Sequence, residues 1–228
     1  MRTPPQEAEP QGPDPASGNG PWVTVAAWRK SERARLLAER QAVPGRLRQR
    51  MAPLILDSLE THVPNLRDAA IGLYWPIRAE IDLRRLTDSC AGTDAIFALP
   101  VVIEKRAPLE FHRWRPGDRL TRGVWNIPVP ATRELVTPDV LLVPLLGHDD
   151  AGYRLGYGGG YYDRTLAAMN PRPQAIGIGY AHARIETIQP QPHDIPMDAI
   201  ITEQGITHFD RSTGRDDQNT ERRISDEH

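Results

Sequence analysis

A strand, a glycine-rich turn, a helix and a second strand follow one another between Val140 and Gly179, and this succession limits the fold more than any other feature. The apolar runs at 140–144 and 175–179 are bounded by Pro or Gly, as buried strands often are, whereas residues 161–169 have helical spacing. Parallel strands joined through a helix form a right-handed crossover, in which the helix packs on one face of the sheet. The sequence therefore predicts an α/β fold with a mainly parallel central sheet.

Shorter patterns predict the remaining elements. Residues 70–75 have the composition of a buried strand that ends at Pro76, and further strands are expected at 95–102, 108–111 and 199–202. Apolar residues at helical spacing predict helices over 25–41 and 46–59, separated by Pro44-Gly45, and the start of a third helix over 81–88. We expect helices on both faces of the sheet, in a Rossmann-like three-layer arrangement that forms a single domain.

The two ends of the chain have a composition typical of disorder. Residues 1–20 are rich in Pro, Gly, Glu and Gln, and residues 212–228 are highly charged without apolar periodicity. Such segments bury too little apolar surface to offset the entropy lost on ordering. We therefore predict a disordered tail over 1–20, a folded domain over 21–211 and a second disordered tail over 212–228.

Composition excludes several classes of protein. Cys90 is the only cysteine of the 228 residues, so an intrachain disulfide and a cysteine-based metal site are both excluded. No apolar run approaches the roughly 20 residues of a membrane helix, and the N-terminus does not resemble a signal peptide. The formal net charge of −2 provides no cationic field for nucleic acid. We expect a cytoplasmic monomer without membrane or nucleic-acid partners, although the arginine-rich residues 29–50 leave an RNA-binding module as an alternative.

Residues 152–164 hold the chemistry-bearing segment, in which four of the five positions from Gly156 to Gly160 are glycine. Glycines before a helix let backbone N–H groups approach phosphate oxygens at the positive helix end, and Arg154 and Arg164 can add charge-assisted hydrogen bonds. The segment has neither the Gly-Lys-Ser/Thr of a P-loop nor an ordered dinucleotide-binding fingerprint. A plain turn can use the same glycines, so the glycines alone leave that alternative open.

The run Arg154-Leu-Gly-Tyr-Gly-Gly-Gly-Tyr-Tyr-Asp163 resembles the ATP-binding signature of the 5-formyltetrahydrofolate cyclo-ligase family. Other segments match the family in order along nearly the whole folded part: Tyr74-Trp75 with Glu80-Ile-Asp, Leu99-Pro-Val-Val, Trp125-Asn-Ile-Pro, Pro138-Asp-Val with Val143-Pro, and His193-Asp-Ile-Pro-Met-Asp. The resemblance implies an enzyme that uses ATP and Mg²⁺ to close 5-formyltetrahydrofolate, with or without a polyglutamate chain, into 5,10-methenyltetrahydrofolate. The resemblance further implies that ADP and phosphate are released after a phosphorylated formyl intermediate. The alternative is a related domain that binds nucleotide or folate without closing the ring.

The resemblance also implies which residues bind ATP. The family has a lysine followed four residues later by an arginine in its first helix; here Arg33 takes the arginine position, and either Arg29 or Lys30 the lysine position. Taken alone, these residues are equally consistent with a solvated helix face. Arg154 and Tyr161 are the expected catalytic residues. The remaining ATP-binding positions are Leu155, Gly156, Tyr157, Gly158, Gly159, Gly160 and Tyr162.

For the folate, flat apolar surface is offered by Trp75, Trp125, Tyr157 and Tyr161, beside the glycines 158–160. Glu80 can accept hydrogen bonds from the pterin N–H groups. The expected Mg²⁺ ligands are Asp163 and Asp194, because carboxylates with retained waters suit this ion. From the residues alone, Asp163 can equally be a first-turn helix acid, and Trp75 and Trp125 core aromatics. His148 and His193 lack metal-ligand spacing and are expected to be structural or to flank the site.

Overall fold

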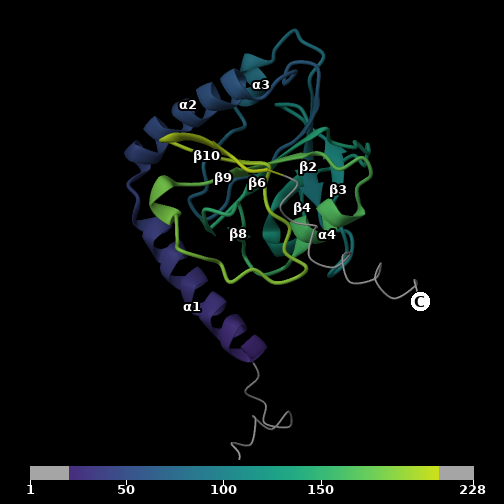
Figure 1. Ribbon diagram of the computed structural model, residues 1–228. Helices are drawn as coiled ribbons and strands as arrows, with labels where there is room; N and C mark the ends of the chain where they lie inside the picture. The colour runs from purple at the N-terminus through teal and green to yellow at the C-terminus, as the bar shows by residue number, and fades with distance from the viewer. Residues whose placement is uncertain (1–20, 211–228) are drawn as a thin grey trace, which may run out of the picture.

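The computed structural model describes residues 21–210, and the predicted tails over 1–20 and 212–228 lie outside the described residues (Figure 1). Within this range the centre is a seven-stranded sheet in the order β11-β10-β9-β6-β1-β2-β3. The five middle strands are parallel, whereas the edge strands β3 and β11 are antiparallel to their neighbours. The sheet strands are β1 (Ala70–Gly72), β2 (Ile96–Val101), β3 (Glu110–Arg113), β6 (Val140–Pro144), β9 (Gln174–Ile178), β10 (Ala199–Thr202) and β11 (Gly205–His208).

Helices cover both faces of this sheet. They are α1 (Pro21–Ala42), α2 (Gly45–His62), α3 (Leu86–Ser89) and α4 (Tyr161–Ala168), with short 3-10 turns η1 (Val124–Asn126) and η2 (Ala181–Ala183). Val140 and Leu142 of β6 share a buried cluster with Leu59 of α2, whereas Leu141 of the same strand packs with Leu166 of α4. Because strand side chains alternate between faces, one apolar strand supplies both cores. The predicted α/β fold with three layers is confirmed.

The order of the parallel strands identifies where a ligand is expected. Numbered along the chain, β1, β2, β6, β9 and β10 lie side by side in the order 2-1-3-4-5, which reverses between β1 and β6. In open sheets of this kind the connections leave in opposite directions at the reversal, and ligands bind beyond the carboxyl ends of those strands. Among residues 21–210, no helix is both long enough and apolar enough to cross a membrane.

Two hairpins outside the main sheet were not predicted from the sequence. The hairpin of β4 (Leu120–Arg122) and β5 (Pro128–Pro130) holds η1 at its tip, and that of β7 (Gly147–His148) and β8 (Arg154–Leu155) leads into the glycine-rich segment. Their strands have two or three residues each, which is too short for a periodic signal. Both hairpins border the site described below.

Several predicted boundaries differ from the structure. The strand over 70–75 pairs only over 70–72, and the strand predicted at 108–111 lies at 110–113. The helix predicted from Ile81 to Asp88 begins only at Leu86. Before it, the Asp82 carboxylate accepts a hydrogen bond from the Arg84 backbone N–H at 3.1 Å. This local turn competes with helix formation, while Ile81 and Leu83 are buried without helical periodicity.

Candidate active site

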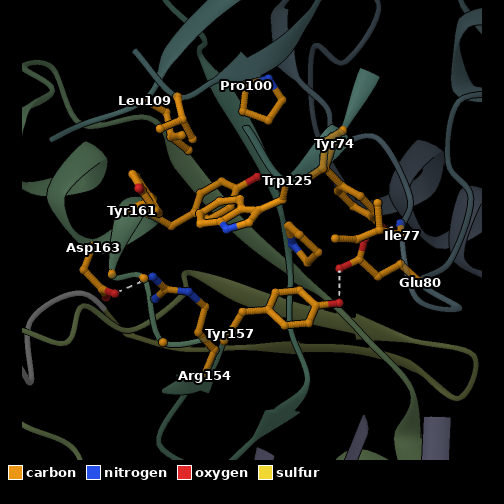
Figure 2. Close-up of a pocket in the computed structure, with 18 of the residues that line it drawn as sticks. Tyr74, Ile77, Glu80, Pro100, Leu109, Trp125, Arg154, Tyr157, Tyr161 and Asp163 are labelled. Atoms are coloured by element: carbon orange, nitrogen blue, oxygen red, sulfur yellow. Dashed lines mark hydrogen bonds and ion pairs between the residues drawn. The ribbon is translucent and has the colours of Figure 1, made fainter. Parts of the chain in front are cut away.

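A cavity of about 450 Å³ lies at the carboxyl ends of β1, β2 and β6, where the strand order reverses (Figure 2). Tyr74 and Trp75 follow β1, Val102 follows β2 and Pro144 ends β6, and all of them line the cavity. The glycine segment and the start of α4 form one side, and the β4–β5 hairpin contributes Trp125. All the predicted site residues except Lys30 line this one cavity.

The glycine segment adopts a conformation that side chains disfavour. Gly158 has φ +93°, and a Cβ there would lie 3.2 Å from Cζ of Arg33. Gly160 is the N-cap of α4 with φ 64° and ψ 21°. Because glycine populates positive φ without penalty, these positions let the backbone turn sharply into the helix. The first turn of α4 therefore presents its unpaired N–H groups and the positive end of its dipole at the cavity wall.

Helix α1 brings a row of arginines to the same end of the cavity. Arg29 is buried and Arg33 half-buried, and Nε of Arg33 donates to the Gly156 carbonyl at 2.8 Å. Burial, and then the charge of Arg29, lower the pKa of Arg33. Lys30, one position along the helix, is exposed and does not line the cavity. Of the two residues considered for the family's lysine position, the geometry therefore favours Arg29.

Two arginine–carboxylate pairs lie in this part of the cavity. Arg154 has two partners, with Nη1 donating to the Ile195 carbonyl at 2.8 Å and Nη2 lying 2.9 Å from Oδ1 of Asp163. Arg29 makes a 2.5 Å contact with Oδ2 of Asp194 and donates through Nε to the Ile188 carbonyl at 3.0 Å. Each carboxylate thus neutralises a buried guanidinium, a role that spacing along the sequence does not reveal.

The Glu80 side chain, only 4% exposed, lies at a different end of the cavity from Arg154 and Asp163 (Figure 2). Its carboxylate accepts hydrogen bonds from the Ile77 backbone N–H and the Tyr157 hydroxyl, both at 2.9 Å. Burial raises the pKa of Glu80, while the Ile77 N–H and the guanidinium of Arg40 oppose that rise. An acceptor group thus lies at this end of the cavity, next to Tyr74, Trp75 and Arg78.

Aromatic rings lie between these two ends. Trp125 is 66% exposed and meets the ring of Tyr161 edge to face, with centroids 5.7 Å apart (Figure 2). Trp125 is thus a cavity-wall residue rather than a core aromatic. Trp75 is both a cavity-wall residue and a core aromatic, because it lines the cavity and also packs edge to face on the buried Trp114. Flat surface of this kind can hold an extended ring system.

Sequence reasoning missed Arg40, which is 2% exposed and contacts both Tyr157 and Glu80. A sequence signal for Arg40 was present, since Arg29, Arg33, Leu36 and Arg40 are spaced four, three and four residues apart and share one helix face.

The two histidines considered in the sequence lie in different places. His193 is exposed and lines the cavity beside Asp194, whereas His148 is buried away from it. Burial lowers the pKa of His148.

One buried carboxylate supports the site from behind. Asp149, 3% exposed, accepts hydrogen bonds from the backbone N–H groups of Ala151, Tyr153 and Ile188 at 3.0 to 3.1 Å. The carbonyl of Ile188 in turn accepts the Arg29 Nε–H. Asp149 thus fixes the backbone segment that holds Arg29.

Replacing Asp149 by Ala is expected to lower the free energy of unfolding by about 3 kcal/mol, because three backbone donors lose their acceptor. Denaturant unfolding followed by circular dichroism measures this loss. The neighbouring Asp150 is the matched control, since its carboxylate is 67% exposed and pairs with an exposed Arg184. Equal midpoints for D149A and D150A would contradict the supporting role of Asp149.

Comparisons with known proteins agree with this geometry. A model of the 5-formyltetrahydrofolate cyclo-ligase family matches residues 25–203. The 5-formyltetrahydrofolate cyclo-ligase of Mycolicibacterium smegmatis is 30% identical over 180 residues, which cover 75% of this chain and 91% of that protein. The Escherichia coli protein of the same name is 27% identical over 170 residues, covering 72% and 93%.

The fold comparison points to the same group of proteins. The solved structure of Aquifex aeolicus 5,10-methenyltetrahydrofolate synthetase superposes with a TM-score of 0.68 at 26% identity, covering 87% of this chain and 99% of that one. The family match spans most of the described residues, including the glycine segment and both arginine–carboxylate pairs. The chain therefore belongs to the 5-formyltetrahydrofolate cyclo-ligase family, a family of ligases.

Proposed function

We propose that this protein uses ATP, with Mg²⁺, to close 5-formyltetrahydrofolate into 5,10-methenyltetrahydrofolate, releasing ADP and phosphate. The observation that carries the proposal is a single cavity with two chemically different ends. One end has the glycine segment, the α4 N-terminus and three arginines, and the other has the buried Glu80 carboxylate. The first suits a triphosphate and the second suits a donor-rich heterocycle.

At the phosphate end, the binding groups are the backbone of Gly156 to Gly160 and the guanidiniums of Arg29, Arg33 and Arg154. Backbone N–H groups at a helix start favour anions, and arginine forks fit phosphate oxygens in two parallel hydrogen bonds. Leu155 and Tyr162 complete the nucleotide contacts in this proposal. The exposed Lys30 is left out.

At the other end, Glu80 accepts hydrogen bonds from the amino-pyrimidinone edge of the pterin. Trp75, Trp125, Tyr157 and Tyr161 contact the rings through their flat faces. This orientation directs the formyl group toward the glycine segment, between the two ends of the cavity. A polyglutamate chain can extend into solvent in the same arrangement.

The proposed reaction has two steps. The formyl oxygen attacks the γ-phosphorus of ATP, the bond to the bridging oxygen breaks, and ADP leaves. N10 of the folate then adds to the activated formyl carbon, N10 loses its proton, and phosphate leaves with the former formyl oxygen. Catalysis rests on positioning and charge stabilisation, so Arg154 serves by stabilising charge on the transferring phosphoryl group and Tyr161 by orienting the folate.

The residues present fit Mg²⁺ as an ion that arrives with the nucleotide. Asp163 and Asp194 both line the phosphate end, but residues 21–210 contain no group of three or more acidic, His or Cys side chains arranged to hold a metal. One or two carboxylates plus substrate phosphates is the usual environment of Mg²⁺ in nucleotide enzymes. When bound, the ion would neutralise phosphate charge. Arg29 and Arg154 hold the two carboxylates in place through their ion pairs.

Replacing Asp194 by Asn is expected to raise the Mg²⁺ concentration needed for half-maximal activity by about 10- to 100-fold, because an amide is a weaker ligand than a carboxylate. The variant also leaves Arg29 without its charge partner, so thermal unfolding is measured in parallel. D150N, which alters an exposed carboxylate outside the cavity, serves as control. An unchanged Mg²⁺ requirement in D194N would remove Asp194 from the metal site.

The proposed function is tested by following methenyl-folate absorbance after mixing protein, 5-formyltetrahydrofolate, ATP and Mg²⁺, with each component omitted in turn. Absorbance growth that requires all of them, with one ADP formed for each product, supports the ligase. Binding of ATP and folate without absorbance growth would instead support a non-catalytic relative that keeps both sites.

We further propose that the enzyme works as a cytoplasmic monomer and binds no nucleic acid. Arg29 and Arg33 line the cavity, Arg40 is buried behind its wall, and Arg35 pairs with glutamates of its own helix. These arginines therefore offer little free positive charge for RNA. Size-exclusion chromatography with light scattering tests the monomer. Filter binding at two salt concentrations tests for RNA, since a phosphate-driven complex weakens steeply with salt.

A further inference from the structure

Arg40 is a buried cation that lies behind the residues of the cavity wall and does not line the cavity itself. The residue is 2% exposed and is not among those that line the cavity. Its Nε donates to the Arg78 carbonyl at 3.0 Å and its Nη1 to the Leu145 carbonyl at 3.3 Å. Its nearest carboxylate is Glu80, whose Oε1 lies 4.0 Å from Nη1. Burying a guanidinium costs desolvation free energy, which hydrogen bonds and a nearby carboxylate offset only in part. A buried arginine at this position therefore suggests a role beyond packing.

The contacts of Arg40 reach Glu80 by a second route through Tyr157. Nη2 of Arg40 donates to the Tyr157 hydroxyl. That hydroxyl donates its own proton to Oε1 of Glu80 at 2.9 Å (Figure 2). Because the arginine has only donors, the hydroxyl must accept from it and is thereby directed to donate to the carboxylate. The guanidinium also lies 5.5 Å from the centre of the Tyr157 ring. Arg40 thus fixes both the ring and the hydroxyl.

This arrangement leaves the Glu80 carboxylate with free acceptor capacity on both oxygens. Oε1 accepts from the Tyr157 hydroxyl, and Oε2 accepts from the Ile77 N–H at 2.9 Å. A carboxylate offers about four lone-pair sites, so one site on each oxygen remains available. Two adjacent N–H donors, such as the amino group and ring N–H of an amino-pyrimidinone, match that pair.

Among the charged groups around Glu80, Arg40 is one of two guanidiniums that favour its ionised form. Burial raises the pKa of this carboxyl, and the two guanidiniums that lower it belong to Arg40, from α1, and to Arg78, from its own loop. The other titratable groups that face it are tyrosines whose pKa values are raised by burial: Tyr74 after β1, Tyr157 of the glycine segment, Tyr162 of α4 and Tyr180 after β9. These tyrosines stay neutral, so Arg40 is the fully buried charge that favours the carboxylate.

We infer that Arg40 is a positioning residue for the folate: without touching it, Arg40 holds the Tyr157 hydroxyl and the Glu80 carboxylate in the arrangement that accepts two adjacent N–H donors. The inference rests on the proposed function and adds to it the groups that specify the substrate's donor edge. In this inference Glu80 contacts the folate, and its ability to accept the two hydrogen bonds depends on the guanidinium of Arg40 behind it.

The test is the pH dependence of the folate Michaelis constant in the variant R40M, which replaces the guanidinium by an apolar chain. We expect KM for 5-formyltetrahydrofolate to rise by about 10- to 100-fold near neutral pH, because hydrogen bonds to a charged acceptor are lost. With Arg40 gone, the pKa of Glu80 rises, so the carboxyl is protonated at low pH and regains its acceptors as pH increases. The KM of R40M should therefore fall toward that of the wild type as the pH increases, whereas KM for ATP stays unchanged.

Two further variants separate positioning from a merely structural role. R40K keeps the charge but loses the fork, so its folate KM should be raised without the pH dependence of R40M. R35M is the matched control, because Arg35 lies on the same helix, is exposed and pairs with Glu32 and Glu39 of that helix. All kinetic constants of R35M should equal those of the wild type.

A folate KM for R40M that equals the wild-type value at every pH would overturn the inference, as would a pH-independent loss shared by both substrates. If R40M does not fold, R40K and Y157F decide, since Y157F removes only the relaying hydroxyl; wild-type folate KM in both variants would overturn the inference. Wild-type protein that forms no product at all would count against the proposed function instead.

Discussion

Replacing Arg154 by methionine is expected to lower kcat/KM for ATP by about 1,000-fold, the loss found when a preorganised charge donor is removed from a transition state. The side chain is only 6% exposed, and its guanidinium is fixed by the Ile195 carbonyl and the Asp163 carboxylate. In the proposed ATP complex, the cation therefore meets the phosphates without reorganising. Methionine keeps much of the volume and removes the charge, and it also leaves Asp163 unpaired.

Steady-state kinetics with ATP varied at saturating folate measures this effect. R154K should recover only part of the activity, because a lysine ammonium cannot reproduce the two-pronged geometry of the guanidinium. R184M is the control, since Arg184 is exposed and pairs with Asp150 outside the cavity. Near-wild-type turnover in a folded R154M would exclude Arg154 from the reaction.

Replacing Gly158 by valine is expected to lower kcat/KM for ATP by about 100-fold, the size of loss that follows a misplacement of about 1 Å at a reacting group. Valine is poorly suited to φ +93°, and its Cβ would lie 3.2 Å from Cζ of Arg33. The segment and Arg33 must both shift. The folate KM should change far less, because Glu80 lies at a different end of the cavity.

The chain offers a close control for Gly158. Gly117 has the same φ of +93°, but a Cβ there would meet nothing within 4 Å, and the residue lies outside the cavity. G117V therefore carries the backbone strain without the steric clash at the phosphate end. Both variants should lose stability to a similar extent in denaturant unfolding, and only G158V should lose ATP use. Equal kcat/KM values for ATP in G158V and G117V would refute the phosphate cradle.

The buried strands were the most predictable part of the fold. The strands at 140–144 and 199–202 occur with the predicted bounds, because every residue of these runs is apolar or β-branched and few other structures suit such a run. The region from Ile81 was predicted wrongly as helix, since side-chain hydrogen bonds of Asp82 compete with the helix and leave no periodic trace. The order of the strands was not predictable either, because it depends on contacts between distant segments.

The candidate site was predictable where one segment carries several of its features. The glycine segment combines dense glycine, flanking arginines and a helix start, so its place in the candidate site could be predicted from the amino-acid sequence. Its role in binding ATP stays a proposal. The partners of its side chains could not. Arg29 meets Asp194 across 165 residues of chain, and Arg40 meets Tyr157 across 117. Only the fold brings those charges together, which is why Arg40 was overlooked and why Asp163 and Asp194 were assigned to a metal without their arginine partners.

The most direct test of the proposed chemistry uses 5-formyltetrahydrofolate that carries a heavy oxygen isotope in its formyl group. If the formyl oxygen attacks the γ-phosphorus, the label must be found in the released phosphate, with one labelled phosphate for each methenyl product. Mass spectrometry of the phosphate measures this transfer. Methenyl product formed with unlabelled phosphate would contradict attack by the formyl oxygen, and with it the arrangement in which one cavity brings the folate to the triphosphate.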